Sequence, residues 1–315
     1  VVMKFDKLTK HLEWGTYYGG SEEVSPISVN YACTDARKLA VPPSGSGVKA
    51  YVYTTGTTNC SDFEIHRNPQ TMFSNALYQA YTTGYHRMWV GAFKKDNGTR
   101  DWATTHGLLD DAYGEEGLAI AFDTQYGLAV GGRVNQNGYT PTTLSYPCVT
   151  PVGAYQQTEG GGFVMHFNPD FTIRWSTAFG GYDENIRRTQ VTDLCFTRNM
   201  GSTQLWLCGA SWGPGFQYEP PANPTFGTAL IASFDIPSLA LEYANLWGGS
   251  GTSVAYGLDF DGKDIWVVGG TESHDLTAVD CPAPASMAGV HHTYVNGGPD
   301  QNFRRCDGFI LALNP

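Results

Sequence analysis

The chain has 315 residues and a formal net charge of −11, with 19 Lys and Arg against 30 Asp and Glu. So few cations, spread without clusters, argue against a nucleic-acid partner, which needs a basic face, and against an anionic membrane surface. Aromatic residues make up 13 % and charged residues 16 %, a composition that favours β-structure. No apolar run reaches the ~18–20 residues of a membrane span.

An aromatic motif that ends in Gly-Gly divides the chain into repeats. It occurs as WGTYYGG from Trp14, WSTAFGG from Trp175 and YANLWGG from Tyr243, and a degenerate copy, WATTHGL, begins at Trp102. The repeat starts at 14, 102, 175 and 243 are therefore 88, 73 and 68 residues apart, and in repeat architectures each repeat forms one supersecondary unit.

The predicted strands follow the same order in every repeat. At the N-terminus, 1–6 and 11–18 are expected to be the third and fourth strands of a repeat. The next repeat has strands at 26–29, 50–56 and 88–96, with a long insertion at 34–49 and a fourth strand at the Trp102 motif. Later strands are predicted at 117–123, 128–132, 162–170 and 175–181, at 191–196, 205–209, 229–235 and 243–249, and at 256–261, 265–270 and 308–315.

These runs predict an all-β fold. They are rich in β-branched and aromatic residues and are bounded by Gly, Asn and Asp, and no helical period of comparable strength occurs. Four antiparallel strands per repeat are typical of a β-propeller blade. We therefore predict that residues 1–315 form a single β-propeller domain in which four to five four-stranded blades are visible.

Closure of the ring is left open by the strand count. Either 11–18 completes the last blade, which leaves 1–6 over, or the chain is a segment of a larger ring. In the second case the ring is completed by a larger parent chain or by another copy, because exposed edge strands are templates for pairing.

Several short elements resemble a known family. The sequences Gly153-Ala154-Tyr155-Gln156 and Ala76-Leu77-Tyr78-Gln79, the FNPD at 167–170, the LNP at 313–315 and the Gly-Gly motifs are similar to the bacterial SBBP-type β-propeller repeats. The resemblance implies a propeller fold and a secreted or cell-surface protein. It implies no particular biochemical role.

Long connections carry the candidate binding residues. The predicted connections between second and third strands run over about 57–87, 133–161, 210–228 and 271–307, far longer than hairpin loops, and they emerge on one face of a propeller. Their aromatic rings could stack on sugar faces or peptide groups, or could instead pin the loops to the scaffold. The candidates are Tyr78, Tyr155, Trp212, Tyr218 and Tyr294.

Acidic pairs are the second group of candidates. They could supply a general acid and a nucleophile for glycoside cleavage, or oxygen ligands for calcium, or they could lie on exposed loops. The stretch Asp259–Asp264 lacks the remaining ligands of a calcium loop, so a hairpin turn is favoured there. The pairs are Glu22-Glu23, Asp110-Asp111, Glu115-Glu116 and Asp183-Glu184.

No sequence motif predicts a cofactor or a metal. The chain has no HExxH, CxxC, GxSxG, P-loop or dinucleotide-binding motif. Of the seven cysteines, Cys195 and Cys208 lie on adjacent predicted strands and Cys281 and Cys306 flank one loop. Disulfides at these pairs or buried thiols are both compatible with the sequence.

The leading functional hypothesis is a non-catalytic extracellular or cell-surface module for adhesion, assembly, or recognition of a glycan or protein on the loop-rich face. The alternatives are a polysaccharide hydrolase or lyase that uses the acidic carboxylates, and a structural subunit of a surface polymer. Self-association accompanies the last hypothesis.

Overall fold

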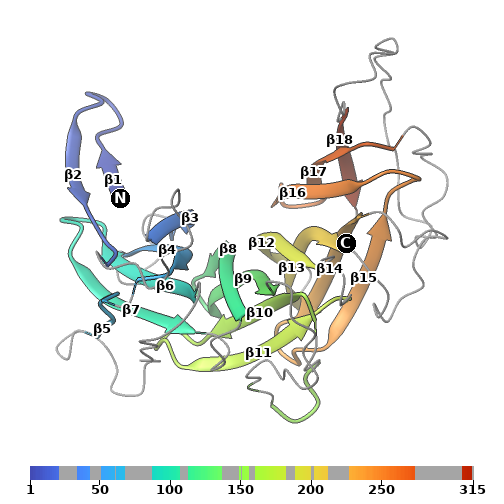
Figure 1. The fold of residues 1–315 in the computed structure, drawn as a ribbon, viewed down its shortest axis with the longest axis horizontal. Coiled ribbons are helices and arrows are strands. Elements are labelled where there is room, and N and C mark those ends of the chain that lie inside the picture. Colours follow the sequence, from blue (N-terminus) through green and yellow to red (C-terminus); the bar gives the residue numbers. More distant parts are fainter. Residues whose placement is uncertain are drawn as a thin grey trace. The chain divides into compact units, whose positions relative to one another are not determined.

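A computed structural model describes residues 1–20, 34–42, 51–60, 62–67, 87–106, 113–136, 149, 151–155, 160–181, 189–199, 202–211, 227–273 and 307–313. These ranges contain β-strands, turns and irregular segments, and no helix (Figure 1). No helix that could span a membrane therefore occurs in them. The predicted all-β class is confirmed.

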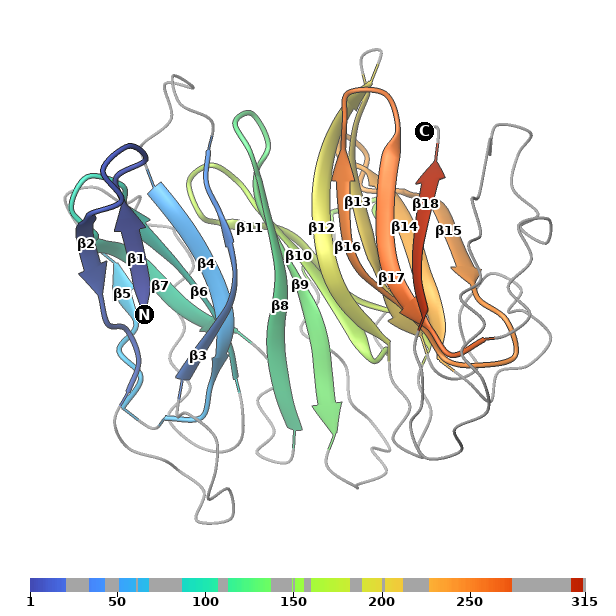
Figure 2. The ribbon, with the colours of Figure 1, turned by 90° about the horizontal axis from the view of Figure 1, so that it is seen from above.

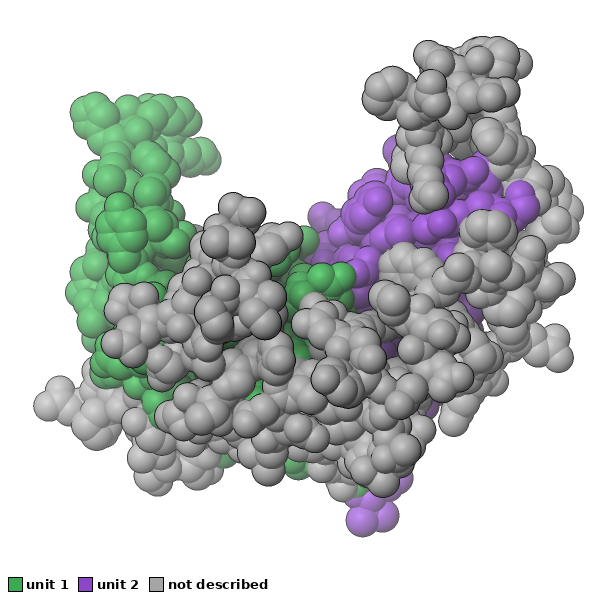
Figure 3. All heavy atoms as spheres, viewed as in Figure 1, with its two compact units in different colours: residues 1–151, 156–159, 163–178 green, residues 152–155, 160–162, 179–315 purple. Residues whose placement is uncertain are grey.

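The chain divides into two compact units, coloured separately in Figure 3. Unit 1 comprises residues 1–151, 156–159 and 163–178, and unit 2 comprises residues 152–155, 160–162 and 179–315.

Unit 1 contains three antiparallel sheets. The first is a hairpin, the second has the order β3-β4-β6-β7-β5, and the third has the order β11-β10-β9-β8. Two end residues of the third sheet, Gly162 of β10 and Phe179 of β11, belong to unit 2. The strands are β1 (Val2–Phe5), β2 (Leu12–Thr16), β3 (Thr34–Ala40), β4 (Tyr51–Thr58), β5 (His66–Arg67), β6 (Arg87–Lys94), β7 (Arg100–His106), β8 (Tyr113–Asp123), β9 (Gly127–Gln136), β10 (Gly162–Phe167) and β11 (Ile173–Phe179).

Unit 2 contains a four-stranded and a three-stranded antiparallel sheet, with the orders β12-β13-β14-β15 and β16-β17-β18. The strands are β12 (Gln190–Asn199), β13 (Ser202–Ser211), β14 (Thr228–Asp235), β15 (Leu241–Trp247), β16 (Ser253–Phe260), β17 (Ile265–Thr271) and β18 (Asp307–Leu313).

The predicted strand order within a repeat is confirmed in the β8–β11 and β12–β15 sheets, where each strand pairs with the next one along the chain. One prediction is wrong. The segment 34–49, expected to be an insertion, begins with β3, which takes the first position of its sheet, while 26–29 lies outside the described residues. Because Asp35, Arg37 and Lys38 make this strand polar, it lacks the apolar run by which the other first strands were found.

Neighbouring sheets within each unit pack face to face. In unit 1, β8 contacts β3, β4 and β6, and Figure 2 shows β8 beside β3 and β4. This packing buries large rings that include Trp102, Phe163 and Phe167. In unit 2, β16 contacts β12, β13 and β14 and buries Trp206 and Phe309 among others. In each unit, the first strand of the later of these two sheets, β8 or β16, is thus the one that lies against the sheet before it.

Each first strand carries a β-bulge opposite a glycine of the second strand, and this explains why the predicted second strands contain glycine. A Cβ atom on these glycines would lie only 1.8 Å (Gly132) to 2.3 Å (Gly269) from a backbone carbonyl oxygen of the first strand. No side chain fits at such a distance, so only glycine permits this pairing. The bulges lie at Ala36/Lys38, Gly117/Ala119, Val191/Asp193 and Ala255/Gly257, opposite Gly56, Gly132, Gly209 and Gly269.

Of the two alternatives for Cys195 and Cys208, a disulfide and buried thiols, the structure shows thiols. The register pairs Cys195 with Trp206 and Cys208 with Asp193. The two cysteines are therefore diagonal neighbours, about 7–8 Å apart in a regular ladder and beyond the usual span of a disulfide. Cys60, by contrast, is disulfide-bonded, and its partner lies outside the described residues, as do Cys281 and Cys306.

Candidate functional site

A pair of hydroxyl groups joins the first and second strands next to the bulge in three of the four repeats. The oxygens lie 2.8 Å apart in Thr34–Thr58 and Thr189–Ser211, and 2.9 Å apart in Ser253–Thr271. The bulge register places Glu115 of β8 at the same position. The β8 strand therefore departs from the repeat by having a carboxylate where the other first strands have a small hydroxyl.

Glu115 is fully buried and forms an ion pair with Arg87 of the neighbouring sheet. The distance between Arg87 Nη1 and Glu115 Oε2 is 3.4 Å, and both side chains are almost completely inaccessible to solvent. A buried carboxylate requires such a partner, because desolvation of an isolated charge is very costly. The pair joins β6 to β8 across the packed sheets of unit 1.

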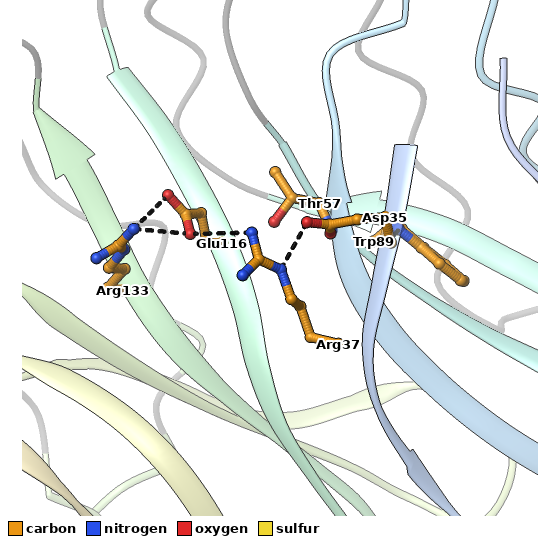
Figure 4. A network of polar contacts seen from close by, with 6 residues as sticks. All are labelled: Asp35, Arg37, Thr57, Trp89, Glu116 and Arg133. Atoms are coloured by element: carbon orange, nitrogen blue, oxygen red, sulfur yellow. Dashed lines mark hydrogen bonds and ion pairs between the residues drawn. The ribbon is translucent and has the colours of Figure 1, made fainter. Parts of the chain in front are cut away.

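Glu116, the next residue, lies between two arginines (Figure 4). Arg133 stands directly opposite it on β9 and donates from Nη2 to both carboxylate oxygens at 2.9 Å. Arg37 of β3 approaches from the neighbouring sheet, with its Nη2 3.9 Å from Glu116 Oε2. Glu116 is only 8 % exposed, whereas Arg37 and Arg133 are 47 % and 38 % exposed.

Asp35 orients Arg37 from the other side. Its carboxylate accepts a hydrogen bond from Arg37 Nε at 2.6 Å and another from the backbone N–H of Thr57 at 2.8 Å. Its backbone carbonyl accepts from the indole N–H of Trp89 at 2.8 Å. The Arg37 side chain, which is the bulged residue of β3, is thereby directed toward β8.

The cluster is electrically balanced, since Asp35, Glu115 and Glu116 face three arginines. Its carboxylates are engaged by guanidinium groups, while the outer guanidinium groups of Arg37 and Arg133 remain partly open to solvent. Such groups can bind a planar anion such as a carboxylate through parallel N–H donors. We call Asp35, Arg37, Glu115, Glu116 and Arg133, with Arg87, the arginine–glutamate cluster.

Most of the cluster lies at one end of its strands. Asp35 and Glu116 are near the beginnings of β3 and β8, Arg133 is near the end of β9, and Arg37 lies in the middle of β3. The connections from β4 to β6, from β7 to β8 and from β9 to β10 all begin or end there. The sequence placed candidate binding loops at this same end, so the cluster lies at their base.

The acidic pair Glu115-Glu116 was expected on a loop, and this expectation is wrong. The pair belongs to β8, is buried and is ion-paired. Glu22-Glu23, Asp110-Asp111 and Asp183-Glu184 lie outside the described residues. Among the residues that are described, no group of three or more metal-binding side chains converges.

The stretch Asp259–Asp264 contains the turn between β16 and β17, at Asp261–Asp264, as favoured from the sequence. The Asp261 carboxylate accepts hydrogen bonds from the backbone N–H groups of Asp264 and Lys263 and from the indole N–H of Trp266. These bonds, the one from Asp264 foremost, lower the pKa of Asp261 to about 2. Asp261 therefore serves to organise the turn.

Of the predicted binding aromatics, only Tyr155 is described, and it packs inside unit 2, to which it belongs. Its ring centroid lies 6.1 Å from that of Phe179 and 5.6 Å from that of Phe234, and its N–H donates to the Leu239 carbonyl at 2.8 Å. This position matches the alternative in which aromatics pin loops to the scaffold, and a binding role for Tyr155 stays a prediction. Tyr78, Trp212, Tyr218 and Tyr294 lie outside the described residues.

Sequence reasoning missed the three arginines. They belong to three different strands, and no short motif joins them. The available signal was the alignment of repeats, because a glutamate pair stands where the other first strands have a hydroxyl residue followed by Asp35, Gln190 or Val254.

Comparison with protein-family profiles and with curated proteins finds no match to this chain.

Proposed function

We propose that this chain is a non-catalytic recognition module of the cell surface or extracellular space, built as a β-propeller or a segment of one, that binds a glycan or protein ligand at the base of its long connections. The observation that carries the proposal is the arginine–glutamate cluster. Within it, Glu115 takes the position that a hydroxyl side chain holds in the other three repeats, and such departures from a structural rule concentrate at functional sites.

The propeller part of the proposal is supported by the repeated unit. Two complete sheets follow the order of a propeller blade, and first strands lie against the preceding sheet in both units. The same bulge and glycine recur four times. The resemblance to SBBP-type repeats points in the same direction.

A non-catalytic role is supported by the state of the carboxylates. A general acid or nucleophile must reach the substrate, and glycosidases place two carboxyl groups about 5–10 Å apart across the scissile bond. Glu115 is fully buried against Arg87, and Glu116 is held by Arg133. These groups are suited to positioning arginines and poorly suited to proton transfer.

An extracellular location is supported by the disulfide at Cys60, because disulfides persist mainly in oxidising compartments.

The ligand chemistry follows from Arg37 and Arg133. Both are held in fixed orientations by carboxylates on their inner side, which lowers the entropy lost on binding, and both have donors on their outer side. A carboxylate, like a phosphate, matches the paired N–H donors of a guanidinium group, and carboxylates are common in both glycans and proteins. We therefore propose a ligand that carries carboxylates, such as an acidic polysaccharide or an acidic protein segment.

The test uses isothermal titration calorimetry with polygalacturonate and with poly-glutamate as probes. We expect at least one of them to bind, and the Arg37→Gln/Arg133→Gln double variant to bind it at least tenfold more weakly. Arg198→Gln, which removes an exposed charge of unit 2, should leave binding unchanged. Fully methyl-esterified polygalacturonate, which lacks the carboxylates, should not bind.

Two results would contradict the proposal. One is the absence of binding to either probe, and the other is equal binding by the double variant and the parent. Release of new reducing or unsaturated ends from polygalacturonate would instead favour the hydrolase or lyase alternative.

A further inference from the structure

The β12–β15 sheet shows how one sheet of this repeat receives the next. Its face toward β16 contains Trp206, Cys208 and Ile231, all at most 4 % exposed. The bulged residue Thr192 points the same way and donates its hydroxyl to the Ala255 carbonyl of β16 at 2.7 Å. We call this side of a sheet, which faces the next sheet along the chain, its forward face, and the opposite side its backward face.

The forward face of the β16–β18 sheet has the same layout. Counted from the bulge, Trp266 corresponds to Trp206 and Val268 to Cys208, and the strand register matches Ile310 with Ile231. Among the described residues nothing covers this face, and the three side chains are 43–58 % exposed. The bulged residue Tyr256 is 60 % exposed.

These exposed side chains form an apolar patch on a rigid sheet. The indole N–H of Trp266 is already satisfied by Asp261 at 2.8 Å, so its ring has only apolar surface left to offer. Contiguous apolar patches on soluble proteins mark interaction sites more often than isolated exposed residues do. The equivalent side chains in the previous repeat are buried by another sheet, which identifies the kind of surface that fits.

The β1–β2 hairpin of unit 1 presents the opposite half of this packing. Its register irregularity after Lys4 matches the one after Ala92 in β6, so Phe5 corresponds to Phe93. Phe93 lies on a backward face and is fully buried against the hairpin's own forward face, formed by Val2 and Trp14. In unit 2 the corresponding residue of β18 is Leu313, which is buried against β12–β15.

The hairpin's own backward face is exposed. Met3 is 52 % and Phe5 57 % exposed, although their counterparts Leu311 and Leu313 in unit 2 are 4 % exposed. Among the described residues, the β16–β18 sheet thus has an exposed forward face and the β1–β2 hairpin an exposed backward face. Within each unit, neighbouring sheets bury such faces against each other.

We propose that these faces join copies of this chain head to tail, with the forward face of β16–β18 in one copy receiving the backward face of β1–β2 in a second copy. The second copy is the occupant because it carries a backward face of the same repeat, with large apolar side chains at the matching positions. An interface between two different faces is heterologous, so it extends into a closed ring or a filament rather than stopping at a symmetric dimer.

The size of the interface sets the expected affinity. The β1–β2 hairpin is short, so the contact belongs to the small, weak class and we expect association at about micromolar concentrations or above. The inference is independent of the proposed ligand site, because none of its residues belongs to the arginine–glutamate cluster.

Sedimentation velocity across a concentration series tests the proposal. We expect the parent chain to gain mass with concentration, and Ile310→Glu and Phe5→Glu each to remain monomeric, because a charge cannot be buried in an apolar contact. Leu8→Glu, in the hairpin turn and outside both faces, is the matched control and should associate like the parent. Circular dichroism verifies that each variant is folded.

Mixing the two monomeric variants gives the sharpest result. Each retains one intact face, so an equimolar mixture of Ile310→Glu and Phe5→Glu should form a 1:1 dimer and nothing larger. A parent chain that stays monomeric, including one in which both faces are protected within a single molecule, would overturn the proposal. So would association that survives both substitutions, or a mixture that stays monomeric. Titration with polygalacturonate in the same variants should be unchanged, which separates this test from that of the ligand site.

Discussion

The two units share one backbone feature but differ in the side chains next to it. In both, a bulge in the first strand lies against a glycine of the second. In unit 1 the residues just before the bulge are Asp35 in β3 and Glu115-Glu116 in β8, and arginines surround them. In unit 2 the corresponding residues before the bulge are Thr189, Gln190, Ser253 and Val254.

This difference separates what the fold requires from what the site adds. The glycine is present in both units because the carbonyl of the first strand leaves no room for a Cβ atom. The charged residues are present in unit 1 alone among these positions, so the scaffold does not require them. The arginine–glutamate cluster is therefore the better candidate for function, and unit 2 serves as an internal reference.

The largest effect is expected from a side chain at the bulge glycine, and it should be equal in the two units. Gly132→Val and Gly209→Val each place a Cβ within 1.9 Å of a backbone oxygen that cannot rotate away. We expect a loss of more than about 4 kcal/mol in the free energy of unfolding, or no folded protein. Urea denaturation followed by Trp fluorescence measures it.

The control for this pair is Gly257→Ala, whose Cβ would lie 3.5 Å from its nearest neighbours. It should cost no more than about 1 kcal/mol. If Gly132→Val and the control were equally stable, the bulge would not be what fixes these glycines.

Removal of the buried carboxylate should rank next. Glu115→Ala leaves Arg87 as a buried charge that has lost this carboxylate, and we expect a loss of about 3–5 kcal/mol in the free energy of unfolding. Hydrogen exchange of the β8 and β9 amides should show the loss in unit 1, while the β13 amides of unit 2 stay protected. Equal loss of protection in both units would mean that the pair stabilises the whole chain rather than unit 1.

The stability of unit 1 should also depend on acid pH more strongly than that of the described part of unit 2. Burial lowers the pKa of His106 and of His166 to about 4, both in unit 1, and the described part of unit 2 contains no histidine. In the unfolded chain each of these two histidines binds a proton near pH 6.5, whereas in the folded chain it does so only near pH 4. The free energy of unfolding should therefore fall as the pH drops from about 6.5 to 4, by roughly 3 kcal/mol for each histidine.

Denaturation of His106→Asn and His166→Asn as a function of pH checks this expectation. Each substitution should flatten the slope of stability against pH between 6.5 and 4, whatever it does to stability at pH 7. A slope that is unchanged in both variants would assign the acid sensitivity to other groups.

The smallest effect is expected at the hydroxyl pairs. Thr189→Val removes the hydrogen bond to Ser211, and Thr34→Val removes the bond to Thr58, while both keep the shape of the side chain. We expect a loss of about 1 kcal/mol at either site. Thermal denaturation measures this loss. If Thr189→Val lowered the free energy of unfolding as much as Glu115→Ala does, the position that the two residues share would be equally critical in both repeats.

Much of the strand pattern was predictable because it depends on local residue types. The runs around Phe122, Phe196 and Phe234 predicted strands, and the Gly-Gly motifs indicated the order of the strands within a repeat. Strand β3 was missed because Asp35, Arg37 and Lys38 gave it no apolar signature. Its place in the sheet is set by pairing with β4, which no local window contains.

The cluster could be predicted only in part. The glutamate pair stood out in the sequence, but its burial depends on β3 and β6 packing over β8. Similarly, Cys195 and Cys208 lie on adjacent strands as predicted, yet a register offset of two residues prevents a disulfide.

The sequence alone determined that this is an all-β chain with a repeated antiparallel strand order, because strand propensity and turn residues act over a few neighbours at a time. The tertiary structure decided which of the charged residues meet. Arg37, Arg87 and Arg133 come from three strands in two sheets, and only the face-to-face packing of those sheets places them around Glu115 and Glu116. The two glutamates, expected on a loop, are instead buried and ion-paired with arginines, because a desolvated charge is stable only beside its counter-charge.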